Sequence, residues 1–209
     1  EQYLRPLVPY MQKKWTNNLC SFLNDQKFPL SLFYFIDYRV LIKSLNKVEV
    51  NLNRWLENDF DFIKNLLYLN KALLAGGSIL NCYINNFNDS VAYMNDIDMY
   101  INQKDLLEIV NILRMNGYYA YKSVLASEYD ESFFRKNNIL SHILFRKSIT
   151  IDGIVSYKIV IDLIVVSDDV KLLDVVKNFD LTICQIWYNG ISVNATHFSN
   201  IDNRHGSLQ

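Results

Sequence analysis

Apolar residues repeat with a helical spacing along the first third of the chain. Residues 9–24 carry an apolar side chain at every fourth position, and residues 35–47 repeat the pattern less regularly. A third stretch, residues 51–71, places five large apolar side chains on one side. Spacings of three and four residues line one face of an α-helix. We therefore predict a helical N-terminal extension over residues 1–70.

The pattern changes at residue 71. Residues 71–75 ("KALLA") are a short apolar run that ends at two glycines, and residues 78–87 resume a helical spacing. Residues 96–101 ("DIDMYI") have the composition of a strand, and residues 103–117 form an amphipathic helix that ends in glycine. This order predicts strand, tight turn, helix, strand and helix.

The rest of the sequence favours strands. An Asp-Gly pair between two β-branched runs, here Asp152-Gly153, is a strong hairpin signal. A short helix is expected at residues 168–179. The expected strands are 139–145, 147–151, 154–166, 181–188 and 191–195. We predict an α/β (α+β) domain over 71–195, a mixed sheet with flanking helices, followed by a polar tail at 196–209.

Composition then narrows the class of protein. The chain has 209 residues, of which 50% are hydrophobic, enough for one sizeable core. Its net charge of −1 means that any nucleic-acid contact must come from a local patch. Three widely spaced cysteines favour reduced thiols and a cytoplasmic protein. The sequence has no apolar run long enough to span a bilayer, so we expect no membrane partner. The abundance of Asn, Ile, Tyr and Lys suggests an AT-rich genome, such as that of a large DNA virus.

The candidate chemistry lies in three aspartates within apolar runs. Side chains alternate along a strand, so Asp96 and Asp98 emerge on one face, about 7 Å apart. Asp162 stands alone in another apolar strand, about 5 Å from one of the pair if the two strands are neighbours. Three such carboxylates repel each other unless a cation joins them. The pattern predicts a site for two Mg²⁺ or Mn²⁺ ions of the kind used in phosphoryl and nucleotidyl transfer.

The two glycines and the following serine supply a complementary feature. Glycine lets the backbone approach a phosphate closely, and a helix that begins there presents unbonded N–H groups. Gly76, Gly77 and Ser78 are therefore candidate nucleotide-binding residues. A plain turn is the alternative interpretation of the same three residues.

Taken in order, these stretches resemble the DNA polymerase β-like nucleotidyltransferase superfamily. The motifs that carry the resemblance are "LLAGGSIL", "NDIDMYI" and "KIVIDLIV". The resemblance implies a nucleotidyltransferase palm in which the glycine turn binds an NTP and the three aspartates hold metal. The closing segment "FDLTICQIWYNGISVNAT" resembles a strand pair of some viral and fungal members. The segment between Ser78 and Asp96 is longer than is usual in that superfamily. This raises the question of whether the glycine turn still lies beside the carboxylates.

Two functions follow from these residues and the resemblance. The first is an intracellular, metal-dependent transferase that moves an NMP from an NTP to a hydroxyl of RNA, a small molecule or a protein and releases pyrophosphate. A modifier of proteins or tRNA of the toxin–antitoxin type is a variant of it. The second is a non-catalytic nucleotide- or protein-binding module. The sequence specifies neither the acceptor, the base nor the oligomeric state.

Four further polar residues lie on the strands around the third acid. His142 is interpreted as a structural histidine with a catalytic role as the alternative. Arg146, Lys147 and Lys158 either pair with a triphosphate or an acceptor backbone or are solvated strand-edge cations.

Overall fold

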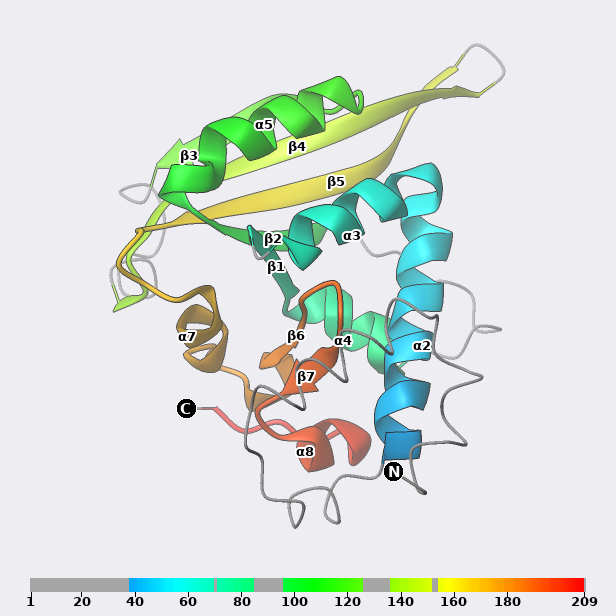
Figure 1. Cartoon of the computed structure of the whole chain (residues 1–209), viewed down its shortest axis with the longest axis vertical. Helices are drawn as coiled ribbons and strands as arrows, with labels where there is room; N and C mark the ends of the chain where they lie inside the picture. The colour runs from blue at the N-terminus through cyan, green and yellow to red at the C-terminus, as the bar shows by residue number, and fades with distance from the viewer. Residues whose placement is uncertain (1–37, 70, 85–95, 126–135, 152–153, 209) are drawn as a thin grey trace. The chain divides into compact units, whose positions relative to one another are not determined.

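The computed structural model describes residues 38–69, 71–84, 96–125, 136–151 and 154–208 (Figure 1). The helix expected at 9–24 lies outside these residues. The chain divides into two compact units, Glu1–Leu41 and Ile42–Gln209, and the second contains the sheet and the candidate site. The boundary expected at residue 70 falls inside this second unit. In the described part of the chain, no helix is both long and apolar enough to cross a bilayer.

One mixed sheet organises the second unit, in the order β3-β4-β5-β2-β1-β6-β7. Among these strands, β2 and β5 run parallel and every other neighbouring pair runs antiparallel. The sheet thus has the predicted α+β character. Its strands are β1 (Ala72–Ala75), β2 (Ile97–Asn102), β3 (Tyr119–Leu125), β4 (Ile139–Ile151), β5 (Ile154–Val166), β6 (Ile186–Tyr188) and β7 (Val193–Ala195).

In the part of the chain that the structure describes, the helices follow the apolar periodicities of the sequence closely, with short 3₁₀ turns between them. The helices are α2 (Tyr38–Leu56), α3 (Phe60–Tyr68), α4 (Gly77–Ile84), α5 (Leu106–Met115), α7 (Leu172–Lys177) and α8 (Phe198–Asp202). The 3₁₀ turns are η3 (Glu57–Asp59), η4 (Gln103–Asp105) and η6 (Thr182–Cys184). The strand, turn and helix predicted at 71–84 are present, and β4 and β5 form the predicted hairpin, paired as far as Ile151 and Ile154.

Five details differ from the prediction. The helix expected over 51–71 is divided by η3, and the two strands expected between 139 and 151 are one strand with a register shift. The strand expected at 181–188 begins with the 3₁₀ turn η6. The polar tail contains α8, whose Ile201 is 1% exposed, because this side chain joins the main core. Strand β3 was not predicted, since the residues from Tyr119 to Ser123 are all exposed and show no apolar alternation.

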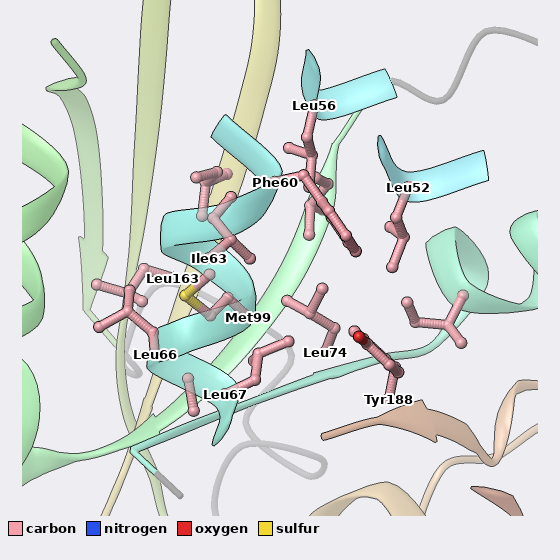
Figure 2. Close-up of a cluster of buried hydrophobic side chains, with 14 of the residues drawn as sticks. Leu52, Leu56, Phe60, Ile63, Leu66, Leu67, Leu74, Met99, Leu163 and Tyr188 are labelled. Carbon is pink, nitrogen blue, oxygen red and sulfur yellow. The ribbon is translucent and has the colours of Figure 1, made fainter. Parts of the chain in front are cut away.

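The main core fills the space between one face of the sheet and the helices α2, α3 and α5. Figure 2 shows Leu52 and Phe60 directed from the helices toward Leu74, Met99 and Leu163 on the strands. Each buried side chain of this size contributes about 1.5–3 kcal/mol relative to an exposed one. This face therefore holds the strands rigidly in place.

The opposite face of the sheet has a smaller core under α7. Val175 and Val176 pack there with Tyr100, Ile164 and neighbouring apolar residues. Tyr100 and Ile164 follow Asp98 and Asp162 by two positions, so both aspartates share this second face. We call it the carboxylate face.

Candidate active site

The parallel pairing of β2 with β5 creates the centre of the site. Asp98 lies directly opposite Asp162, and Met99 lies opposite Leu163. Met99 and Leu163 are completely buried in the main core, so the register is fixed by their packing. A shift of one residue would exchange carboxylates and core side chains. The apolar neighbours of each aspartate thus determine where its carboxylate lies.

Asp96 completes the cluster predicted from the sequence. It precedes β2, and one carboxylate oxygen from each of Asp96, Asp98 and Asp162 lies within 4.8 Å of the others. Asp96 is exposed, Asp98 is partly buried and Asp162 is buried, so the cluster opens toward solvent at Asp96. Hard divalent cations such as Mg²⁺ are bound by one or two carboxylates together with water and substrate phosphates. The donor set and its open side fit such an ion.

The electrostatics of the cluster also favour a bound cation. Burial, followed by the negative charge of Asp96, raises the pKa of Asp98 to about 7. Burial, followed by the charges of Asp98 and Asp96, raises the pKa of Asp162 to about 8. Both carboxylates therefore resist ionisation near neutral pH on their own. An adjacent cation reverses this effect because it favours the charged form.

The glycine turn lies against the cluster. Gly76 has a φ of +82°, and a Cβ atom at this position would stand 3.1 Å from the Asp98 Oδ2. Its N–H donates a hydrogen bond to the Ile186 carbonyl at 3.1 Å, which anchors the turn to β6. A Cβ at Gly77 would have no heavy atom within 4 Å, so the backbone beside it is open to a ligand. The long segment before Asp96 does not separate the turn from the carboxylates.

Ser78 provides a buried hydroxyl next to this turn. Its side chain is 6% exposed, and its Oγ has no hydrogen-bond partner among the residues that the structure describes. Buried polar atoms normally have partners, so this hydroxyl can still accept or donate a bond. Ser78 lies in the first turn of α4, where backbone N–H groups precede the regular helical bonds. An anionic group would satisfy these donors.

His142 lies closer to the centre than the sequence suggested. It occupies β4 opposite Ile164, and its Nε2 contacts the Asp162 Oδ1. Burial, followed by the positive charge of Lys122, lowers the pKa of His142, whereas Asp96 raises it. The strand register alone brings this histidine to the third acid. No local sequence motif identifies it.

The three predicted strand cations separate into different environments. Lys147 donates a hydrogen bond of 2.6 Å to Asp59, which also accepts one from Tyr118. The Arg146 guanidinium instead stacks over the ring of Tyr121, 3.4 Å from its centroid. The side chain of Lys158 lies outside the described residues. Arg146 thus lies against an exposed aromatic ring, whereas Lys147 is bonded to Asp59 on the other side of the sheet.

The fold and the site together define an α+β domain with a carboxylate centre beside a glycine turn. The chain belongs to the Gad2 family, described as Gabija anti-defense 2 family protein, whose model matches residues 43–201. No curated protein and no solved structure matches the chain.

This match corrects the superfamily suggested by the sequence. The family found is Gad2, and the assignment to the DNA polymerase β-like nucleotidyltransferases was wrong. That assignment was based on a Gly-Gly-Ser turn, an Asp-x-Asp strand and one further acid. These short elements are each compatible with many α+β sheets, because turns favour glycine and strand ends tolerate aspartate. The function of the site must therefore be argued from its geometry.

Proposed function

We propose that this domain is a metal-dependent nucleotidyltransferase. The observation that carries the proposal is the in-register pair Asp98 and Asp162, with Asp96 in the same cluster and Gly76 against Asp98. Carboxylates on adjacent strands beside an open glycine turn suit a substrate that is both phosphorylated and metal-bound. An NTP combines these two properties.

The reaction transfers an NMP to a hydroxyl. The acceptor oxygen attacks the α-phosphorus, the bond from that phosphorus to the bridging oxygen breaks, and pyrophosphate leaves. Asp96, Asp98 and Asp162 would hold Mg²⁺ or Mn²⁺, which supplies positive charge for the phosphate oxygens when it is bound. Asp162, the most buried of the three, is the residue best placed to receive the hydroxyl proton.

The glycine turn is assigned to the triphosphate of the donor. The Gly76 N–H is already bonded to Ile186, so the donors that remain are the open backbone at Gly77 and the unsatisfied Ser78 hydroxyl. Backbone N–H groups at the start of α4 add to them. This arrangement gives the β- and γ-phosphates a site next to the carboxylates.

The description of the family supports a second candidate. Gad2 proteins are described as Gabija anti-defense proteins, and a protein can oppose a defense system by modifying one of its components or by occluding it. The same fold would then bind nucleotide or protein without turnover. Such a module predicts that substitution of Asp162 leaves its anti-defense effect intact, whereas the transferase predicts loss of that effect.

The test supplies each α-labelled NTP with Mg²⁺ or Mn²⁺ to the purified chain, together with RNA, single-stranded DNA and a cell lysate as acceptors. Asp98→Asn and Asp162→Asn are the test variants. Asp61→Asn is the matched control, because Asp61 is an exposed acid on α3 away from the carboxylate face. We expect label to reach one acceptor class with the unaltered chain and the control only. Folded protein that transfers no label with any acceptor would contradict the proposal and favour the binding module.

A further inference from the structure

The carboxylate face continues beyond β2 and β5 onto two further strands. Asp162 pairs with Leu144 on β4, and Leu144 pairs with Lys122 on β3. Residues directly opposite each other on paired strands share a face. Lys122 therefore lies on the carboxylate face, in the same cross-strand row as Asp162 and about 10 Å from it by strand spacing. Lys122 is exposed and forms no ion pair with any residue that the structure describes.

A register shift in β3 brings an aromatic ring to the same face. The shift lies between Ala120 and Lys122, which leaves Tyr121 as the extra residue of a bulge. Bulges redirect side chains and recur beside functional sites. The Arg146 guanidinium lies 3.4 Å from the centroid of the Tyr121 ring. The ring and the guanidinium are thus held together as a stacked pair.

The stacked pair belongs to the carboxylate face as well. Arg146 lies opposite Val160, which precedes Asp162 by two positions on β5. Alternation along β5 places Val160 and Asp162 on one side of the sheet, and Arg146 shares that side. Strand geometry puts Arg146 about 8 Å from Asp162. Tyr121 remains 37% exposed, so part of its ring is accessible. We name Tyr121, Lys122 and Arg146 the basic-aromatic strip.

The strip and the glycine turn flank the carboxylates on opposite sides. The turn follows β1, on one side of β2, whereas β4 and β3 lie on the other side, beyond β5. A transferase needs its donor and its acceptor on opposite sides of the reacting phosphorus, because attack is in line with the leaving group. With the donor triphosphate assigned to the turn, the strip is left for the acceptor.

We propose that the basic-aromatic strip binds the acceptor, and that the acceptor is a single-stranded nucleic acid. The inference rests on the proposed function for the identity of the reaction. The binding surface itself is argued from the strand register and from the stacking of Arg146 on Tyr121. Cations that track phosphates together with an aromatic ring that stacks on a base are the combination used to bind single strands. With a net charge of −1, the chain needs such a local patch to hold a polyanion next to three carboxylates.

The strip also matches nucleic acid better than a protein acceptor. A distance of about 10 Å from Lys122 to Asp162 corresponds to about three nucleotides at the rise of a stacked strand. Lys122 and Arg146 would therefore contact backbone phosphates while the terminal hydroxyl reaches the carboxylates. A protein acceptor would need a hydroxyl side chain and has no repeating charge for these two cations to follow.

The experiment separates binding from transfer. Fluorescence anisotropy measures the affinity of labelled single-stranded RNA and DNA oligonucleotides without NTP, over a series of salt concentrations. The variants are Lys122→Ala, Lys122→Glu and Arg146→Gln. Arg114→Gln on α5 is the matched control, an exposed cation on a helix that packs against the opposite face. Asp98→Asn serves as a transfer-defective chain that should still bind the oligonucleotide.

We expect Lys122→Ala to reduce the slope of log affinity against log salt by about 0.7, the value for one phosphate contact to a single strand. Lys122→Glu should weaken binding further, and it places the new charge at an exposed site where folding is unaffected. In the transfer assay, the KM for the oligonucleotide should rise about tenfold while the KM for NTP is unchanged. Arg114→Gln should leave all of these values unaltered.

Three results would be decisive. Oligonucleotide affinity that is unchanged in both Lys122 variants would overturn the inference, and so would label that appears on lysate proteins while nucleic acid stays unlabelled. Binding that depends on Lys122 without any transfer by the unaltered chain would support the surface and overturn the proposed reaction. The two proposals can therefore fail separately.

Discussion

The two faces of the sheet differ sharply along the same two strands. On one face, Met99 and Leu163 are completely buried beneath helices. On the other, the adjacent residues Asp98 and Asp162 face each other with pKa values raised to about 7 and about 8. The packing of the first face stabilises the fold, whereas the carboxylate pair on the second opposes folding when it is charged, because buried like charges cost free energy. Rigid packing on one side is what holds repelling groups together on the other.

The largest expected effect separates activity from stability. Asp98→Asn should lower transfer by about a thousandfold, which corresponds to about 4 kcal/mol in the activation barrier. Because it removes a buried charge, it should leave the melting temperature equal or higher in the absence of metal. Steady-state kinetics and thermal denaturation of the same preparation measure both quantities. A variant that is fully active would contradict the assignment of the carboxylate centre.

A substitution in the main core, on the other face of the sheet, should have the reverse pattern of effects on stability and activity. Leu163→Ala should lower the free energy of unfolding by about 2–5 kcal/mol, since it creates a cavity in the main core. The activity per folded molecule should change far less than in Asp98→Asn. Urea denaturation provides the free energy, and activity is normalised to the folded fraction. A loss of activity as large as that of Asp98→Asn, in folded protein, would show that the two faces are not separable.

A smaller effect is expected at the turn. Gly76→Ala forces a side chain into a φ of +82° and brings its Cβ to 3.1 Å from Asp98. The backbone conformation alone costs about 1–2 kcal/mol. Gly77→Ala is the control for stability, because a Cβ there would have no heavy atom within 4 Å. Chemical denaturation of both variants tests this expectation. Equal stability of the two would mean that the turn relaxes without strain.

The pH dependence of the metal-free protein is a separate expected effect, which involves the carboxylate pair as a whole. The folded pKa values of Asp98 and Asp162 lie above the usual value of 3.8, so the folded state favours the protonated form. Stability should therefore be highest below about pH 4, fall as the pH rises toward about 8, and level off above that. Melting temperatures in a chelator across this range test the direction.

Added Mn²⁺ should reverse the fall near neutral pH, since a ligand that binds the folded state stabilises it. Asp98→Asn should flatten the pH profile, and Met99→Leu should leave it unchanged. A profile that is identical for the unaltered chain and Asp98→Asn would contradict the assignment of the raised pKa to this pair.

Much of the candidate site could be predicted because local rules determine it. Alternation along a strand placed Asp96 and Asp98 together, and the apolar run around Asp162 marked it as a buried acid. Gly76 was singled out because it opens a Gly-Gly-Ser turn before a helix, where glycine lets the backbone approach a phosphate closely. These inferences depend on neighbours in the sequence, and the described geometry agrees with them.

The remaining features depend on register between distant segments. The contact of His142 with Asp162 and the stacking of Arg146 on Tyr121 arise only when β4 is paired on both sides. Strand β3 was missed because exposed strands lack the apolar alternation that a sequence reveals. Which strand neighbours β2 is a non-local property. The sequence therefore predicts that Asp162 lies near the other two aspartates only if their strands are neighbours in the sheet. The family could not be deduced from short motifs at all.

The parallel pairing of β2 with β5 has a consequence for the order of events in synthesis. Parallel neighbours require a crossover, here the segment that includes α5, β3 and β4. The third carboxylate therefore joins the first two only after this whole segment has been made and folded back. Such a long-range contact forms late because loop closure must come first. A chain still being translated, or one whose hairpin has opened, has no complete carboxylate centre, so the metal binding proposed for this centre would report on the finished sheet.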